Sequence, residues 1–150
     1  MTILDTLLVV VVDEPGRERD ALRTMLASMQ NVRIVEMLSD CNDLKSWIIG
    51  HYPDLVVIRE RSVNGACLDS LLSVKIANPQ TRFLVIVEKM EQVHALLAEG
   101  IDHVFLKGFT STELFAVLDQ WSMEKILHYF TEEQKPSVLK GSDSYLEMLI

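Results

Sequence analysis

The chain alternates between two hydrophobic periods, and this alternation limits the folds open to it more than any other feature. Short runs rich in β-branched and aromatic residues, which favour strands, lie at Leu7–Val12, Arg33–Met37, Leu55–Ile58, Phe83–Val87 and His103–Leu106. After each run, apolar residues recur about every 3.6 positions, which predicts a helix. We therefore expect five strand–helix units.

The first, third and fourth runs are apolar throughout, as strands buried on both faces are. This is typical of a parallel sheet with helices on both sides, so the predicted fold class is α/β. Turn residues agree with the division: Pro15 can lie in the first turn of helix one, Gly100 can end helix four, and Thr110 with Glu113 can form a capping box before helix five.

The composition fits one domain and limits the kinds of partner that we expect for the protein. The 22 acidic residues exceed the 14 basic ones, for a net charge of −8, and no Lys/Arg block could follow a phosphate backbone, so we expect no direct nucleic-acid partner. Leu7–Val12 is far shorter than the roughly 20 residues of a membrane span, and no membrane association is expected. Cys41 and Cys67 lie in apolar settings and are interpreted as buried thiols in a reducing compartment, which predicts a cytoplasmic protein.

Charged residues follow four of the five predicted strands. Asp13-Glu14 follow the first, Arg59 the third, Glu88 the fourth and Lys107 the fifth. In an open parallel sheet the carboxyl ends of strands form the functional edge. The sequence holds no glycine-rich dinucleotide loop, Cys/His ligand set or nucleophile elbow, so we expect no enzyme of those classes.

The acidic pair, PDLVVI at strand three, AEGID before strand five and LKGF at its end, in this order and spacing, resemble the receiver domain of two-component response regulators over about residues 5 to 122. The resemblance implies a flavodoxin-like, doubly wound (βα)5 fold with a five-stranded parallel sheet in order 2-1-3-4-5. It further implies bacterial two-component or phosphorelay signalling. Asp13 and Glu14 match the pair that holds magnesium in the family, and Lys107 matches the family's lysine.

The phospho-acceptor position departs from that family. The register of Pro53-Asp54 and the four apolar residues after it places the family's acceptor aspartate on Arg59. An arginine cannot accept the phosphoryl group in the family's manner, and Glu60, one residue on, would point to the other face of the sheet. Val87, or alternatively Glu88, stands where the family has Ser or Thr. The resemblance is therefore to a degenerate pseudo-receiver.

The expected cluster of Asp13, Glu14, Arg59 and Lys107 has formal charges that sum to zero. We hypothesise that the Arg59 guanidinium occupies the space of magnesium and phosphoryl group together and forks onto Asp13 or Glu14 as a bidentate pair. No cofactor or metal is then expected; magnesium on Asp13 and Glu14 is the alternative if the pocket is competent. Gly108 replaces the family's proline after the lysine, so a trans peptide bond is expected there.

The apolar stripe of predicted helix five continues past Trp121 to Phe130. We divide the chain into a receiver-like domain with an extended fifth helix, residues 1–130, and a tail, residues 131–150, which is a short helix or the start of a linker broken at Pro136. In the family, helix four, strand five and helix five contact targets or a second copy. The candidate interface residues are Phe115, Trp121, Met123 and Phe130. The alternative is that the tail covers them.

Three interpretations of function stay open. The first is a receiver-like signalling module that acts through a protein partner or as a homodimer and is not phosphorylated by the usual mechanism. The second is a phosphorylatable receiver that uses an unusual acceptor such as Glu60 or Glu88. The third and weaker one is a small flavodoxin-like ligand-binding protein or enzyme.

Overall fold

The computed structural model describes residues 6–42, 44–59 and 65–138. Within them, strands and helices alternate in the order β1 Leu7–Val12, α1 Arg17–Ala27, β2 Val32–Leu38, α2 Leu44–His51, β3 Leu55–Arg59, α3 Gly65–Ala77, β4 Arg82–Val87, α4 Met90–Ala98, β5 His103–Leu106 and α5 Ser111–Val138. All neighbouring strands pair in parallel, and the sheet order is β2-β1-β3-β4-β5. The predicted fold class and strand order are confirmed.

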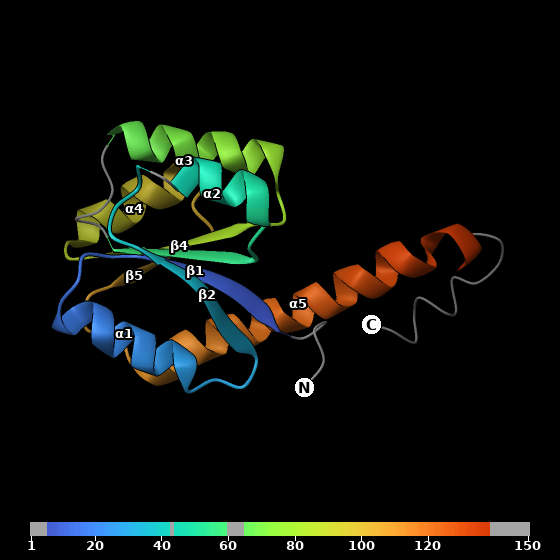
Figure 1. Ribbon diagram of the computed structural model, residues 1–150, viewed down its shortest axis with the longest axis horizontal. Helices are drawn as coiled ribbons and strands as arrows, with labels where there is room; N and C mark the ends of the chain where they lie inside the picture. Colours follow the sequence, from blue (N-terminus) through green and yellow to red (C-terminus); the bar gives the residue numbers. More distant parts are fainter. Residues whose placement is uncertain (1–5, 43, 60–64, 139–150) are drawn as a thin grey trace.

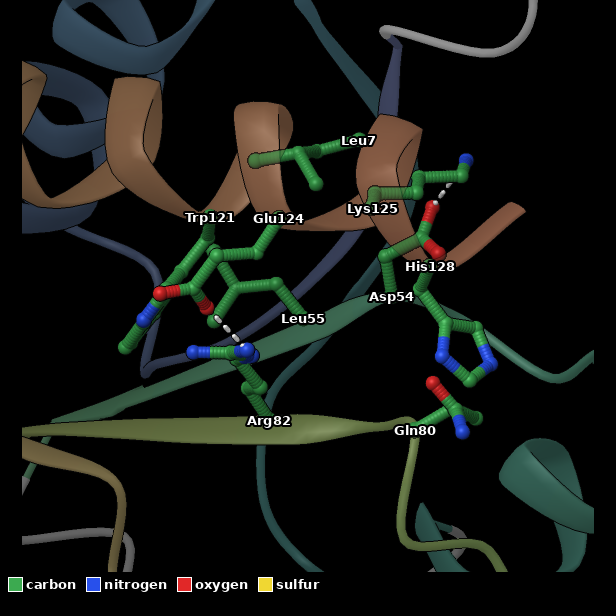
Figure 2. A pocket seen from close by; sticks show the side chains of 9 residues that line it. All are labelled: Leu7, Asp54, Leu55, Gln80, Arg82, Trp121, Glu124, Lys125 and His128. Carbon is green, nitrogen blue, oxygen red and sulfur yellow. Dashed lines mark hydrogen bonds and ion pairs between the residues drawn. The ribbon is translucent and has the colours of Figure 1, made fainter. Parts of the chain in front are cut away.

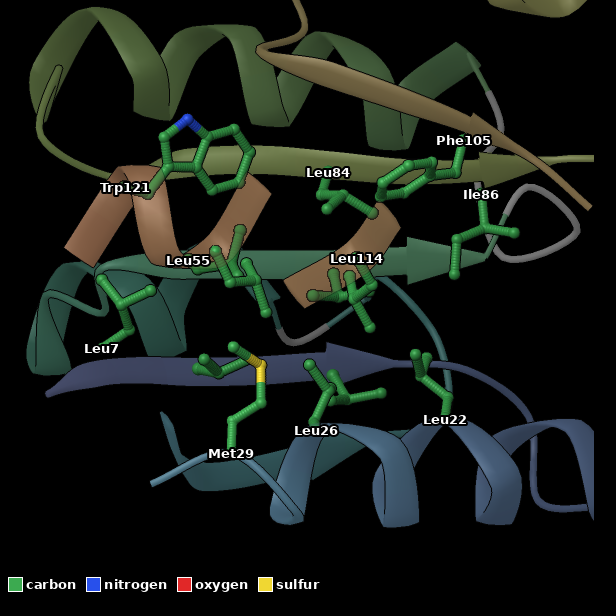
Figure 3. Close-up of a cluster of buried hydrophobic side chains, with 14 residues drawn as sticks. Leu7, Leu22, Leu26, Met29, Leu55, Leu84, Ile86, Phe105, Leu114 and Trp121 are labelled. Atoms are coloured by element: carbon green, nitrogen blue, oxygen red, sulfur yellow. The ribbon is translucent and has the colours of Figure 1, made fainter. Parts of the chain in front are cut away.

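The sheet is the middle layer of three. Figure 1 shows α1 and α5 on one face and α2, α3 and α4 on the other. The side toward α1 and α5 is filled by one cluster of buried side chains, drawn in Figure 3, which includes Leu22, Leu26 and Leu114. A second cluster, including Phe83, fills the opposite side. Because adjacent strand residues point to opposite faces, β1, β3 and β4 contribute to both clusters, which explains their unbroken apolar runs.

Helix α5 is longer than the sequence indicates. It passes the domain boundary expected at residue 130 and continues through Pro136 to Val138, so the expected break at Pro136 is wrong. Its start agrees with the prediction, since the Glu113 N–H donates to Thr110 Oγ1 at 3.1 Å. Figure 1 shows the second half of α5 extending beyond the end of the sheet.

Two smaller expectations near the helix ends have different outcomes. Helix α4 ends just before Gly100, whose φ of 96° suits glycine, as predicted. Helix α1 begins at Arg17, so Pro15 precedes its first turn instead of lying in it. The described residues include no cis peptide bond, and the bond before Gly108 is therefore trans as expected.

Cys41 departs from its sequence interpretation. It is disulfide-bonded, so its interpretation as a buried thiol is wrong. The chain has one other cysteine, Cys67, whose side chain lies outside the described residues. The cysteines consequently give no support to a reducing compartment. Among the helices of the described residues, none has the length and apolar character needed to cross a membrane.

Candidate functional site

Three charged side chains continue one row of the sheet past its carboxyl edge. In β1, Val9 and Val11 point toward α1 and α5, and the next residue of that row is Asp13. The same alternation places Arg59 at the end of β3 and Lys107 directly after β5 on this side of the sheet. Pairing of β1 with β3, Val12 beside Ile58, then brings Asp13 next to Arg59.

Arg59 and Asp13 form a buried ion pair. The guanidinium Nε donates to Asp13 Oδ2 at 2.6 Å. The Asp13 side chain has no exposed surface, and that of Arg59 is 12% exposed. A charge-assisted hydrogen bond this short, away from water, satisfies two charges that would each be costly to bury alone.

Glu18 completes the pairing of the guanidinium, and sequence reasoning missed it. Arg59 Nη1 lies 3.1 Å from Glu18 Oε2, and Nη2 donates to the Glu18 backbone oxygen at 3.4 Å. The described contacts thus divide the fork between Asp13 and Glu18, where a bidentate pair on Asp13 or Glu14 was expected. The available signal was position: Glu18 lies in the first turn of α1, the helix that begins at this edge of the sheet.

Lys107 extends this arrangement toward solvent. Its Nζ lies 3.7 Å from Glu18 Oε1 and 3.6 Å from Glu88 Oε1, and its side chain is 53% exposed. Positive and negative groups therefore alternate across the edge, from buried Asp13 through Arg59, Glu18 and Lys107 to Glu88. We call these five residues the edge network. The exposed end contributes little to stability because water screens it.

The other predicted pocket residues lie elsewhere. Val87 is fully buried in the cluster on the α2–α4 side, and only its backbone oxygen faces this edge, where it accepts the Lys107 N–H at 2.7 Å. Glu14 is exposed, and Glu60 lies outside the described residues. Gly108 has a φ of 99°, which proline cannot adopt, so the loop after Lys107 takes a path closed to the family's proline.

The edge network does not fit a magnesium ion. Mg²⁺ requires carboxylate and water oxygens in an octahedron. The buried carboxylate, Asp13, already contacts the Arg59 guanidinium, and a divalent cation beside it would meet like charge. Among the described residues, no group of three His, Cys, Asp or Glu side chains could hold a metal ion. A mostly apolar hollow of about 180 Å³ adjoins the network, between α1 and the loop after β5.

The interface candidates differ in exposure. Met123 is 56% exposed, whereas Phe115 packs partly against the core and Phe130 is partly buried. Trp121 is 7% exposed and belongs to the core, with the Arg82 guanidinium 5.2 Å from its ring centroid. Trp121 thus offers little surface to a partner, whereas Met123 offers the most of the four candidates, and the interface stays a prediction.

A second cavity, which is more polar than the first, lies at the opposite, amino-terminal edge of the sheet. Its volume is about 140 Å³, and α5 forms one wall. Figure 2 shows the two ion pairs that cross it, Arg82 with Glu124 and Lys125 with Asp54. Asp54 Oδ2 also accepts the Leu8 N–H at 2.8 Å, and Lys125 Nζ donates to the Thr6 backbone oxygen at 2.7 Å. These contacts fix the middle of α5 to β3 and β4.

The fold, five parallel strands in the order 2-1-3-4-5 with five helices among the described residues, matches that of receiver domains. No protein-family model matches the chain, and no curated protein does. Among solved structures, it is similar to the signal receiver domain of response regulator NarL from Mycobacterium tuberculosis, with 26% identity and a TM-score of 0.66 over 77% of this chain and 96% of that one.

Two further structures show the same fold at lower identity. The response regulator domain of Thermotoga maritima CheB is 18% identical, with a TM-score of 0.62 over 78% of this chain and 96% of that one. A pilus assembly-related protein from Burkholderia pseudomallei is 12% identical, with a TM-score of 0.69 over 81% of this chain and 93% of that one. The neighbours thus support the receiver resemblance.

Proposed function

We propose that this chain is a receiver-like signalling module of a two-component or phosphorelay-related pathway that acts through protein contacts and does not accept a phosphoryl group in the usual way. It is not an enzyme and needs no cofactor. The receiver fold of its structural neighbours supports the signalling class. The buried Arg59–Asp13 pair carries the pseudo-receiver part of the proposal.

The reasoning is electrostatic. Acyl phosphate formation needs a carboxylate nucleophile and cations that neutralise the developing negative charge. At the end of β3 this chain presents a guanidinium, which is not a nucleophile, and the guanidinium already neutralises Asp13. Asp13 and Glu18 hold it from two sides, so the site has no need of a metal ion.

The test is incubation with acetyl phosphate and Mg²⁺ followed by intact-mass measurement. The expected result is no phosphoryl adduct on the wild-type chain. The same treatment of Glu88→Gln and Glu60→Gln variants separates the alternatives. An adduct on the wild type that one of these variants loses would overturn the proposal in favour of a receiver with an unusual acceptor.

The proposed partners are proteins, in the cytoplasm, with no direct role for nucleic acid. The exposure of α4 favours a contact surface formed by α4, β5 and α5. None of the side chains of α4 is buried, and Met90 and Leu97 are 54% and 47% exposed. Such exposed apolar side chains are typical of contact surfaces when they gather on one face.

A further inference from the structure

An apolar groove lies between α2 and α3, two helices on the face of the sheet opposite α5 (Figure 1). It has a volume of about 180 Å³, and most of its surface is apolar. Ile48 and Val74 line it and are buried. Ile49 and Tyr52 line it as well, but they are 57% and 67% exposed. We call it the α2–α3 groove. Large apolar residues left in water at a concave site indicate that another segment covers them.

Tyr52 has an unusual backbone conformation beside the groove. It directly follows α2, its N–H donates to the Ile48 backbone oxygen at 2.9 Å, and its φ is 49°. Glycine or asparagine is usual at such a position, because other side chains are sterically disfavoured there. The backbone therefore holds an exposed aromatic ring at the groove at a cost in conformational energy, which favours a role in binding.

The α2–α3 groove suits a protein segment better than a small organic molecule. Its volume is below the roughly 300–1,000 Å³ of pockets that enclose drug-sized ligands. Lys45 also lines the groove and is exposed, so a positive charge lies beside the apolar surface. A segment that combines apolar side chains with acidic ones is complementary to this surface.

Residues 141–150 of the same chain have this chemistry. Their sequence, GSDSYLEMLI, has five apolar side chains from Tyr145 onward and two acidic ones, Asp143 and Glu147. These residues lie outside the described part of the chain, which ends with α5 at Val138. The segment therefore offers both features that the α2–α3 groove would recognise.

The groove lies within reach of this segment. Helices α2 and α3 end just before β3 and β4 begin, at the amino-terminal edge of the sheet, and α5 leaves the domain at the same edge, where Lys125 Nζ donates to the Thr6 backbone oxygen at 2.7 Å. From Lys125 to Val138, α5 extends about 20 Å further, and helices on opposite faces of one sheet lie about 20 Å apart. The return path is then about 28 Å, whereas the chain from residue 139 to Leu149 can span about 37 Å.

We propose that residues 141–150 bind the α2–α3 groove of their own chain, with their apolar side chains on Ile49 and Tyr52 and their acidic side chains near Lys45. The inference goes beyond the proposed function, because α2 and α3 are not part of the surface formed by α4, β5 and α5. A segment joined to its site by a short linker acts at a roughly millimolar effective concentration, so a weak contact is sufficient. Burial of the exposed apolar residues supplies the driving force.

Photo-crosslinking from position 52 tests the contact. Tyr52 is replaced by p-benzoylphenylalanine, which keeps an aromatic ring at this position. After irradiation, a crosslink to the tryptic peptide 141–150 is expected in the product that has the mass of one chain. The same photo-reactive residue at Thr24, an exposed position of α1 on the opposite face of the sheet, is the control and should not capture this peptide.

Variants of the segment test the chemistry of the contact. Leu146→Glu combined with Leu149→Glu should lower the crosslinked fraction at least ~fivefold, because charged groups would replace apolar side chains on an apolar surface. The matched control is Ser142→Glu, a polar position before the apolar residues, which should leave the crosslinked fraction undiminished. Circular dichroism confirms that each variant is folded.

Four results would overturn the proposal. The first is the absence of any crosslink between position 52 and residues 141–150, and the second is a crosslinked product with the mass of two chains, which would assign the groove to a second copy. The third is a double variant that crosslinks as well as the wild-type segment. The fourth comes from the photo-reactive residue at Met123, an exposed position of α5: capture of the segment there and not at position 52 would show that it covers α5 instead. None of these results depends on phosphoryl transfer, so failure here is distinguishable from failure of the proposed function.

Discussion

Arg59 Nε lies 2.6 Å from Oδ2 of Asp13, a carboxylate with no exposed surface at the carboxyl edge of the sheet. The arginine ends β3, and the aspartate directly follows β1. In a receiver fold, this edge is where the resemblance places phosphorylation chemistry. Here the same edge holds a buried ion pair.

Arg59→Ala should lower the free energy of unfolding by about 3 kcal/mol, because it leaves the buried Asp13 charge without its guanidinium. Urea denaturation followed by circular dichroism measures the loss. Glu88→Ala is the matched control at the exposed end of the edge network and should cost less than about 1 kcal/mol. Equal losses in the two variants would contradict a buried ion pair that stabilises the fold.

Millimolar Mg²⁺ should leave the thermal midpoint of the wild-type chain unchanged, because Arg59 occupies the position beside Asp13. Arg59→Asp removes the cation and adds a carboxylate near Asp13 and Glu14, the type of ligand that Mg²⁺ prefers. Its midpoint should therefore rise by roughly 3 °C when Mg²⁺ is added at several times its dissociation constant. A midpoint shift in the wild type would instead indicate a competent metal site.

The stability of the protein should fall in mild acid because of His103 on β5. Burial lowers the pKa of His103 below its ordinary value of 6.5. Below about pH 6.5 the unfolded chain therefore binds the proton more readily than the folded chain, so stability is full above that pH and is lost as pH falls toward the folded pKa.

The check is urea denaturation of wild type and His103→Gln at about pH 7.5 and about pH 5.5. The ring of His103 contacts Phe105 edge-on, with centroids 4.5 Å apart, so its protonated form would be held against an apolar neighbour. The glutamine variant should lose less stability between the two pH values than the wild type does. An identical pH dependence would show that another group is responsible.

Asp54→Ala should destabilise the protein by about 2 kcal/mol, because one carboxylate oxygen serves both the Leu8 N–H and the Lys125 ammonium. Asp119→Ala is the control on α5, because the Asp119 carboxylate accepts an exposed hydrogen bond from Asn31. Its removal should lower the free energy of unfolding by less than about 0.5 kcal/mol. The Asp54 variant should also loosen the second half of α5, which faster amide hydrogen exchange there would reveal.

Much of the fold was predictable because strand residues in this protein carry a strong local signal. The bounds of Leu7–Val12 and His103–Leu106 agree with the structure residue for residue, since charged or turn residues flank each apolar run. The resemblance also predicted Asp13, Glu14, Arg59 and Lys107 at one edge of the sheet; the structure has Asp13 and Arg59 in contact there and Lys107 nearby, whereas Glu14 is exposed. The interface stays a prediction.

Two of the misses come from contacts between distant parts of the chain. Glu18 joins Arg59 across 41 positions, and this pairing depends on how α1 lies over the edge of the sheet. Cys41 gives no local sign of its disulfide bond. The continuation of α5 through Pro136 also escaped prediction, because proline read alone indicates a helix end.

The sequence by itself determined the five strand–helix units, the sheet to which they assemble and the arginine at the end of β3, because apolar period and residue identity are local properties. Only the tertiary structure decided that Arg59 divides its fork between Asp13 and Glu18. It alone also decided that Leu114 and Leu118 of α5 are buried while Met123 and Leu127 are exposed. Charge pairing and burial depend on distances between elements, and packing sets these distances only once the chain has folded.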